Sequence, residues 1–370
     1  MKPRDRVLAA LNRQPVDRIP YCDHLIDFTV ARKALGPLKS LNLLKLTFPV
    51  LKEFGLKELS AIIQASDDPE KIACDPELSD RAFHLMSMAE PILSKMLYRD
   101  NITFWDGAFC FEGGKFYLLN PETPELGFAA DGILKSFDDL DKLIFRTDID
   151  RIISKAEKFL KHKGDLAACA MIYLGIDPAW HSMGIETFSM ACLQEPDLVG
   201  EVLGRITDWY ADMAVELCKL DFDFIWAADD IAFSTGPFFS PKVYRNVLLP
   251  HTRKVAEKIT KPWIYHSDGN LLPIWEDLTS QGMNAIHPLE AGSMDLKQLK
   301  SDYGKDISFA GGMDLRILEA GTPEETREFT EFLIETLGPT GYIYGSSNSI
   351  TAGVKPENYR AMIDTILEKG

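Results

Sequence analysis

Short apolar runs alternate with longer stretches of helical periodicity through the C-terminal two-thirds of the chain. Most of the runs are short, rich in β-branched or aromatic residues, and bounded by Gly, Pro or Asp, which is typical of buried parallel strands. The pattern therefore predicts six strands, and the runs are Leu166–Ile176, Phe222–Ala228, Trp263–His266, Ala285–Pro288, Ile307–Ala310 and Tyr342–Tyr344.

The stretches between these runs carry the start and stop signals of helices. The pattern predicts one long helix from about Glu186 to Leu220. Ser240 is a capping residue and Pro241 suits the first helical position, so a second helix begins there. The other predicted helices are Leu271–Gln281, which ends at Gly282, a helix opened by Pro323 after Thr322, and Pro356–Lys369.

Six consecutive strand–helix units require a parallel sheet, because each crossover returns the chain to the same strand direction. A closed eight-stranded barrel and an open doubly wound sheet both fit this order. The open sheet usually carries a glycine-rich phosphate-binding turn, and the sequence contains neither GxGxxG nor GxxxxGK[ST]. We therefore predict an α/β fold of the TIM-type (β/α)8 barrel class. Arg18–Cys22 is one candidate for a further strand, and Ile102–Phe104 or Phe116–Leu119 supplies or flanks another.

The predicted organisation is a single barrel domain over residues 1–370 with N-terminal helical decoration. Residues from about 35 to 95 have the pattern of a helical insertion that caps the barrel near its mouth. No Gly/Ser-rich linker, low-complexity block or repeat of 20–50 residues interrupts the strand–helix series.

Composition and charge exclude several classes of protein. The 370 residues are 46% hydrophobic and 26% charged, which is ordinary for a globular domain. The formal net charge of −16 would repel a duplex or a phospholipid surface, so we expect no nucleic-acid or membrane partner. We also expect neither a signal peptide nor a transmembrane helix. The six cysteines are scattered without a CxxC pair, which favours a cytoplasmic enzyme. The sequence leaves open whether it is a homodimer.

Polar residues follow the predicted strands at the points where each strand ends. In a barrel these C-terminal strand ends form the active-site face, so the residues just after each apolar run carry the most information. Five of the six ends have an ionisable group, which predicts one convergent, acid-rich pocket. The residues are Asp177, Asp229–Asp230, His266–Asn270, His287 with Glu290, Gly311–Asp314, and Ser346–Ser349.

His266 and Asp268 form an H-x-D pair across one strand end. An imidazole and a carboxylate at this spacing can share a divalent metal ion, or they can act as an oriented acid–base pair. The alternative is structural, with Asp268 as a helix N-cap beside a hydrogen-bonded histidine. We favour a functional pair because the strand-end position and the following Gly269 indicate a crowded site.

The remaining acidic candidates also have a structural alternative. Of the adjacent Asp229 and Asp230, we expect one to cap or pair and the other, more readily Asp230, to face the pocket. Glu290 could be a metal ligand, a base or a solvated loop residue. Glu186 opens a helix, where a carboxylate is favoured by the helix dipole in any case. Asp314 suits an N-cap of the next helix equally well.

Several segments in consistent order resemble the uroporphyrinogen decarboxylase superfamily over nearly the whole chain. That superfamily has a TIM-type barrel fold, which agrees with the strand pattern. It divides into tetrapyrrole decarboxylases and cobalamin-linked methyltransferases. The segments that carry the resemblance are Arg4–Leu11, Pro15–Pro20, Ser240–Pro241, Leu249–His251, His266–Asn270, Gly311–Asp314 and Ser346–Ile350.

The chain departs from the decarboxylase branch near its N-terminus. The decarboxylases have an Arg-Gln-Ala-Gly-Arg-Tyr segment there, whose arginines bind propionate side chains. The comparable stretch here is Asp23-His24-Leu25-Ile26-Asp27-Phe28, which has two carboxylates and no arginine. Such a pocket would repel a substrate with eight carboxylates, so decarboxylation of uroporphyrinogen is not expected. Asp27 is instead a candidate substrate contact.

The methyltransferase branch is a better match, but with different metal ligands. Its methanol- and methylamine-type members hold zinc through an H-x-C motif and a later cysteine. This chain has His266-Ser267-Asp268 and the Gly345–Ser346 region at those places, so both thiolates are missing. Thiolate ligands suit the activation of a thiol, whereas an oxygen-rich site suits an ether or hydroxyl oxygen as leaving group. The change resembles the substrate-side component of O-demethylase systems, which pass a methyl group from an aryl methyl ether to the Co(I) of a separate corrinoid protein.

The resemblance implies a corrinoid-dependent methyltransferase whose small-molecule methyl donor is a methoxylated aromatic compound. His266 and Asp268 would hold zinc or act as the acid–base pair. Asp230 and Glu290 would complete the catalytic shell with Glu186 nearby. The candidate substrate contacts are Asp229, His287, Asn348 and Asp27. One alternative is a decarboxylase of a smaller carboxylated substrate, which would use the same carboxylates to protonate a carbanion. Another is a barrel that only binds a ligand.

Overall fold

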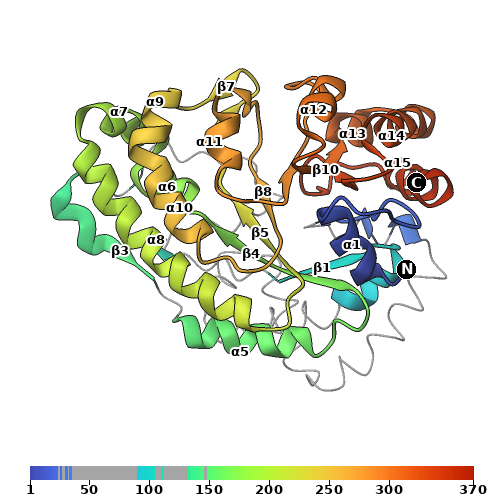
Figure 1. Cartoon of the computed structure of the whole chain (residues 1–370), viewed down its shortest axis with the longest axis horizontal. Coiled ribbons are helices and arrows are strands. Elements are labelled where there is room, and N and C mark those ends of the chain that lie inside the picture. Colours follow the sequence, from blue (N-terminus) through green and yellow to red (C-terminus); the bar gives the residue numbers. More distant parts are fainter. Residues whose placement is uncertain are drawn as a thin grey trace.

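The computed structural model describes residues 1–23, 26, 30–31, 33–35, 90–104, 110–111, 132, 134–145 and 148–370. Seven parallel strands form one sheet in the order of the sequence (Figure 1). Nearly all of their residues are buried, as the continuous apolar runs predict. The strands are β1 (Asn101–Phe104), β4 (Ala167–Tyr173), β5 (Phe224–Ala228), β8 (Trp263–His266), β9 (Ala285–His287), β10 (Ser308–Met313) and β11 (Tyr342–Ser346).

A short segment around Tyr21 joins the two edges of this sheet. Tyr21 forms a parallel bridge with Tyr344 of β11, where Cys22 N donates to the Tyr344 carbonyl at 2.9 Å. On the other side, Asp100 N donates to the Tyr21 carbonyl at 2.8 Å, immediately before β1. The segment predicted as a strand over Arg18–Cys22 therefore closes the ring. The predicted TIM-type barrel is confirmed.

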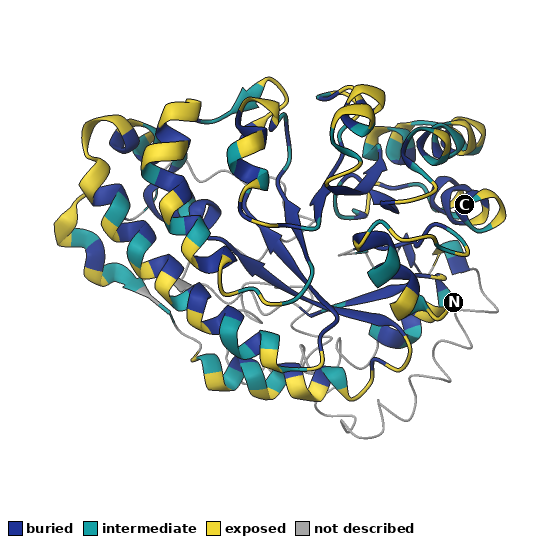
Figure 2. Cartoon of the chain, viewed as in Figure 1, coloured by how far each residue is buried: buried dark blue, intermediate teal, exposed yellow. Residues whose placement is uncertain are grey.

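Helices surround the sheet, each with a buried side toward the strands and an exposed side toward solvent (Figure 2). Four of them lie in the first half of the series: α5 (Ile149–Leu160), α6 (Ile176–Met183), α7 (Ile185–Gln194) and α8 (Pro196–Lys219). The later helical segments are α9 (Pro241–Val243), the π-helical turn η3 (Tyr244–Leu248), α10 (Leu249–Ala256), η4 (Leu272–Ile274), α11 (Trp275–Thr279), α12 (Leu296–Tyr303), α13 (Leu315–Ala320), α14 (Pro323–Leu337) and α15 (Pro356–Lys369).

One helix covers an end of the barrel, and the remaining elements are short. Helix α1 (Pro3–Leu11) covers the bottom, which is the end where the strands begin. Ser308 Oγ, at the start of β10, donates to the carbonyl of Ala10 at 2.9 Å. The short elements are the 3-10 helix η2 (Phe137–Lys142), the pair β2 (Cys110–Phe111) and β3 (Leu143–Ile144), and the hairpin of β6 (Ala232–Phe233) and β7 (Gly236–Pro237).

One helix prediction was wrong. The expected continuous helix from Glu186 to Leu220 is two helices, α7 and α8, which meet at Glu195 and Pro196. Proline has no backbone N–H and disfavours helical geometry at the residue before it. Glu195 accordingly has φ −136° and ψ 56°, outside the helical region. The predicted start at Ser240 is confirmed, because Ser240 Oγ accepts a hydrogen bond from Val243 N at 3.3 Å.

Strand β10 extends further than its apolar run. Gly311 and Gly312, expected in a turn after the strand, lie inside it with φ of +83° and +110°. A Cβ on Gly311 would lie 2.8 Å from Cδ2 of His287 on the neighbouring strand β9. Glycine is required there because the β10 backbone passes directly against the histidine ring.

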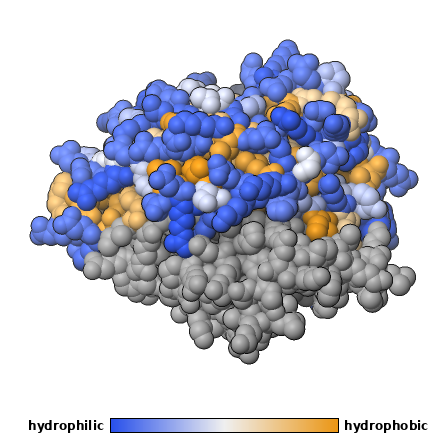
Figure 3. Space-filling model, turned by 90° about the horizontal axis from the view of Figure 1, so that it is seen from below, coloured by the Kyte–Doolittle hydropathy of each residue, from blue (hydrophilic) through white to orange (hydrophobic). Residues whose placement is uncertain are grey.

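Some predictions fall on residues that the structure does not describe. The helical cap expected over about 35–95 lies mostly in this part of the chain, as do Asp27 and the strand candidate Phe116–Leu119. Among the described residues, no helix is both long and apolar enough to cross a membrane. Figure 3 shows a face whose described part is largely hydrophilic, with apolar residues in separate patches.

Candidate active site and metal centre

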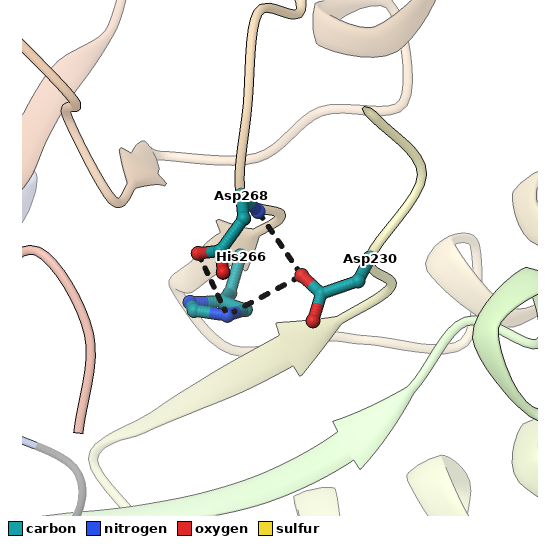
Figure 4. Close-up of side chains that lie close together, drawn as sticks. All are labelled: Asp230, His266 and Asp268. Atoms are coloured by element: carbon teal, nitrogen blue, oxygen red, sulfur yellow. Dashed lines mark hydrogen bonds and ion pairs between the residues drawn. The ribbon is translucent and has the colours of Figure 1, made fainter. Parts of the chain in front are cut away.

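Three predicted site residues meet at the mouth of the barrel, which is the end where the strands finish. Asp230 follows β5, His266 is the last residue of β8, and Asp268 follows two residues later (Figure 4). His266 Nε2 lies 3.6 Å from Asp230 Oδ1 and 3.9 Å from Asp268 Oδ1. One potential ligand atom from each residue lies within 4.8 Å of the others, so the three side chains can hold a metal ion together.

Hydrogen bonds fix the carboxylates of this cluster. Asp268 N donates to Asp230 Oδ1 at 3.0 Å, so the backbone of one acidic residue orients the side chain of the other. Asn348 Nδ2 donates to Asp268 Oδ2 at 2.8 Å from the end of β11. Glu290 Oε2 accepts from Gly269 N at 3.1 Å. The predicted residues Asp230, Asp268, Glu290 and Asn348 therefore belong to one connected site.

The second oxygen of Asp268 has no such partner. Asp268 Oδ1 is buried, and no described group donates a hydrogen bond to it. A buried carboxylate oxygen without a donor is costly, so it usually carries a proton or faces a cation. Because His266 Nε2 and Asp230 Oδ1 are its neighbours, this oxygen indicates a place for a positive charge.

Burial shifts the proton affinities of the cluster in opposite directions. Burial raises the pKa of Asp268 to about 9, and the nearby carboxylates of Asp230 and Glu290 add to the effect. Burial also raises the pKa of Asp230, again with a contribution from Glu290. Burial lowers the pKa of His266 to about 4. Without a metal ion, the cluster therefore has a neutral imidazole and at least one protonated carboxyl group at neutral pH.

Asp229 and Asp230 have different surroundings, as adjacent acidic residues often do. Asp229 is fully buried, and its Oδ1 accepts from Gly175 N at 3.1 Å and from Asp177 N at 2.9 Å, at the start of α6. Its carboxylate thus caps a helix, whereas Asp230 faces the cluster. The role of substrate contact that the sequence suggests for Asp229 stays a prediction.

The other candidates lie outside the carboxylate cluster. His287 is 2% exposed and its Nδ1 lies 2.6 Å from Nδ1 of His266, on the side of the ring away from the carboxylates. Glu186 is exposed in the first turn of α7, and no contact among the described residues joins it to the cluster. Asp314 caps α13, because its side chain accepts from Arg316 N at 2.8 Å.

The structure adds His181 to the predicted pocket and gives a role to Asp177, which the sequence analysis named only as a strand-end residue. Asp177 is 8% exposed in the first turn of α6, and its Oδ1 lies 3.2 Å from Nε2 of His181. Burial raises the pKa of Asp177, and its charge in turn raises the pKa of both His266 and Asp268. The sequence signal was the strand-end position of Asp177 with a histidine four residues later, on the same helix face.

The fold and this site define the class of protein as an α/β barrel with a metal-capable, acid-rich centre at its mouth. Residues 176–368 match the uroporphyrinogen decarboxylase (URO-D) family, which is just over half of the chain. The chain belongs to that family.

Curated relatives include enzymes of two kinds. The methylated-thiol–coenzyme M methyltransferase of Methanosarcina mazei is 22% identical over 204 residues, which is 55% of this chain and 53% of the relative. The uroporphyrinogen decarboxylase of Trichlorobacter lovleyi is 24% identical over 171 residues, 43% of this chain and 49% of the relative. The chain thus spans about half the length of these curated relatives.

Solved structures share the fold over a larger part of the chain. A methyltransferase from Methanosarcina mazei has a TM-score of 0.65 at 17% identity, covering 100% of this chain and 99% of that one. A B12-independent methionine synthase from Shewanella sp. W3-18-1, in complex with selenomethionine, has a TM-score of 0.52 at 12% identity. The match covers 80% of this chain and 90% of that one. At these identities the likeness concerns the fold.

Proposed function

We propose that the protein is a methyltransferase that takes the methyl group of a methoxylated aromatic compound and passes it to the Co(I) of a separate corrinoid protein. The observation that carries the proposal is the donor set of Asp230, His266 and Asp268 at the barrel mouth. The relationship to a methylated-thiol methyltransferase supports methyl transfer as the general reaction.

The residues of the cluster fit a zinc ion. His266 Nε2 and a carboxylate oxygen of Asp268 would hold it, and Asp230, whose Oδ1 lies 3.6 Å from His266 Nε2, would lie beside the ion as the proton donor. The buried Asp268 Oδ1, which has no described donor, would face the ion. A zinc ion bound there would act as a Lewis acid on the oxygen that leaves the methyl group. Oxygen ligands in place of thiolates favour an ether over a thiol as substrate.

The reaction breaks the O–CH3 bond and forms a bond between the methyl carbon and cobalt. The electron pair of the broken O–CH3 bond remains on the phenolate oxygen, and the new bond takes its electron pair from Co(I). The charge on the phenolate oxygen must then be neutralised by a proton or a cation. Burial raises the pKa of Asp230, so this carboxyl group keeps a proton to higher pH than an exposed one and can donate it to that oxygen. Glu290, which accepts a hydrogen bond from Gly269 N, would help Asp230 to keep that proton, because its charge also raises the pKa of Asp230.

Decarboxylation of a smaller carboxylated substrate is the second candidate, because the family and the Trichlorobacter lovleyi relative are decarboxylases. In that reaction the raised pKa of Asp230 would serve to protonate a carbanion. The local acidity disfavours a substrate with many carboxylates, since five acidic side chains lie at or next to the cluster: Asp177, Asp229, Asp230, Asp268 and Glu290.

One assay separates the two candidates. The purified protein, treated with chelator or reconstituted with zinc, is incubated with a panel of methoxyarenes in the presence or absence of a Co(I) corrinoid protein. Methyl transfer predicts that a phenol forms only with zinc and corrinoid protein together. Release of CO2 from a carboxylated arene without corrinoid protein would favour the decarboxylase and contradict the proposal.

A further inference from the structure

Two histidine side chains face each other directly behind the proposed metal site. His266 and His287 are paired residues on the neighbouring strands β8 and β9, and their Nδ1 atoms lie 2.6 Å apart. At this separation two N–H groups would clash and two lone pairs would repel, so the two nitrogen atoms share one proton. The remaining question is which ring carries that proton.

The hydrogen bond of the second ring nitrogen of His287, Nε2, shows which ring carries the shared proton. His287 Nε2 lies 3.2 Å from the carbonyl oxygen of Ser346, and a carbonyl can only accept, so Nε2 carries a hydrogen. The ring is 2% exposed and meets the Trp226 indole edge-on, with ring centres 4.8 Å apart. An imidazole whose single ring hydrogen is on Nε2 has a lone pair on Nδ1. The Nδ1 of His287 is then an acceptor, and the shared proton belongs to His266.

The Ser346 carbonyl is itself held in place by the segment that closes the barrel. Ser346 N and Oγ both donate to Asp23 Oδ1, at 2.8 and 2.6 Å. Asp23 Oδ2 accepts from the Tyr21 hydroxyl at 2.6 Å. Across the ring of His287, a Cβ on Gly311 would lie only 2.8 Å from Cδ2, so the ring packs tightly between its neighbours. These contacts determine the orientation of His287.

We propose that His287 is a positioning residue that sets the tautomer of His266. His266 donates Nδ1–H to His287, and its Nε2 lone pair therefore faces Asp230 and Asp268. A histidine can bind a metal only through a nitrogen lone pair, and the hydrogen bond at the other nitrogen decides which one is available. The inference rests on the proposed function in that it takes Nε2 as a zinc ligand. It replaces the role of substrate contact that the sequence suggested for His287.

The first test measures the tautomer itself in the wild-type protein. Metal-free protein is labelled with 15N-histidine, and long-range 1H–15N correlation spectra show which ring nitrogen is protonated. The spectra of His266→Ala and His287→Asn assign the two rings. We expect His266 to be protonated at Nδ1 and His287 at Nε2. A His266 ring protonated at Nε2, or a doubly protonated His287, would overturn the inference.

The second test is a pair of substitutions with zinc ions alone as the probe. His287→Phe keeps a ring but removes both nitrogens, whereas His287→Asn keeps an acceptor, Oδ1, on the same carbon that carries Nδ1. We expect zinc affinity to fall by ~10–100-fold in His287→Phe and to recover to within about fivefold of wild type in His287→Asn. Equal affinity in all three proteins would overturn the inference.

These readouts are independent of the proposed reaction. Neither requires a methoxyarene or a corrinoid protein, so a failure of methyl transfer with the expected tautomer and zinc affinities would count against the function alone. Circular dichroism verifies the fold of each variant. If His287→Phe does not fold, the wild-type tautomer and the zinc affinity of His287→Asn still decide the inference, because both are measured on folded protein.

Discussion

Aspartates at the two ends of the barrel have different partners. At the bottom, Asp100 is 1% exposed and its Oδ1 accepts from Arg6 Nη1 at 2.7 Å and from Arg18 Nη2 at 3.0 Å. Its Oδ2 accepts from Tyr21 N at 2.9 Å. At the mouth, Asp268 has other carboxylates as neighbours and a buried oxygen that no described group bonds. Arginines of the chain neutralise the carboxylate of Asp100, whereas the carboxylate of Asp268 needs a proton or a bound cation.

A second residue at the bottom supports this distinction. Asp223 comes immediately before β5, with a side chain that is fully buried, and Arg4 Nε lies 2.5 Å from its Oδ1. Its Oδ2 accepts from Ala168 N at 2.9 Å. An ionised group costs several kcal/mol to bury unless it is paired, so these arginines stabilise the fold. The crowded carboxyl groups at the mouth cost stability, which is expected of a functional site in a barrel.

The largest effect is expected from removing the central imidazole of the mouth. His266→Ala should bind no stoichiometric zinc and should lose methyl transfer completely, because among the described residues it is the one nitrogen donor of the proposed metal cluster. Zinc content and phenol formation are measured on the same preparation. His251→Ala, on α10 and outside the cluster, is the matched control and should keep both. Full zinc content in His266→Ala would remove this ligand assignment.

Removal of the proposed proton donor should have the next largest effect. Asp230→Asn keeps the side-chain shape but cannot donate a carboxyl proton, so demethylation should fall by ~10²–10⁴-fold. Glu290→Gln should cause a smaller loss, and Glu186→Gln, at an exposed position, none. The defect of Asp230→Asn should shrink for methoxyarenes with electron-withdrawing groups, whose phenolates need less stabilisation. A defect that is independent of leaving-group acidity would mean that Asp230 only positions the substrate.

Stability should respond in opposite ways at the two ends. Asp100→Asn removes the carboxylate that pairs with both Arg6 and Arg18, so that Arg6 keeps only Asp17 as a charge partner, and it should destabilise the fold by about 3 kcal/mol. For a chain of 370 residues that corresponds to a fall of about 4 °C in Tm. Asp268→Asn removes a carboxylate from an acidic cluster, so the metal-free Tm should stay the same or rise. Thermal unfolding in chelator measures both, and a similar fall in the two variants would contradict the distinction.

A smaller effect is expected from pH on zinc binding. Because burial raises the pKa of Asp268 to about 9, zinc must displace its proton at neutral pH. The apparent zinc affinity should therefore rise by about tenfold per pH unit below that value, with about one proton released per ion. Calorimetry in buffers of different ionisation enthalpy measures the released proton. Asp268→Asn should abolish this release, and an unchanged release in that variant would place the proton elsewhere.

Much of the fold could be predicted because buried parallel strands have continuous apolar sequences. Trp263–His266 matches β8, and the edge-closing segment Arg18–Cys22 was found from its pattern. The break at Pro196 was missed although proline marks such boundaries, because the apolar period of the helix continues beyond it. The end of β10 was missed because Gly311 and Gly312 are typical turn residues, and only the neighbouring ring of His287 explains them.

The part of the site that lies directly after the strands could be predicted from the sequence. That position identified His266, Asp268 and Asp230, since residues after parallel strands meet at one end of a barrel. The contact between His266 and His287 depends on the register of β8 and β9, which a single sequence does not specify. The capping role of Asp229 depends likewise on where α6 begins. Contacts across strands therefore had to come from the structure.

The central claim is that the mouth of the barrel takes a positive ion that the chain does not supply. The most direct measurement is diffraction from crystals of zinc-reconstituted protein on both sides of the zinc absorption edge. We expect one strong anomalous peak per chain among His266 Nε2 and the carboxylate oxygens of Asp230 and Asp268. A map without a peak there, in protein shown to contain stoichiometric zinc, would contradict the account.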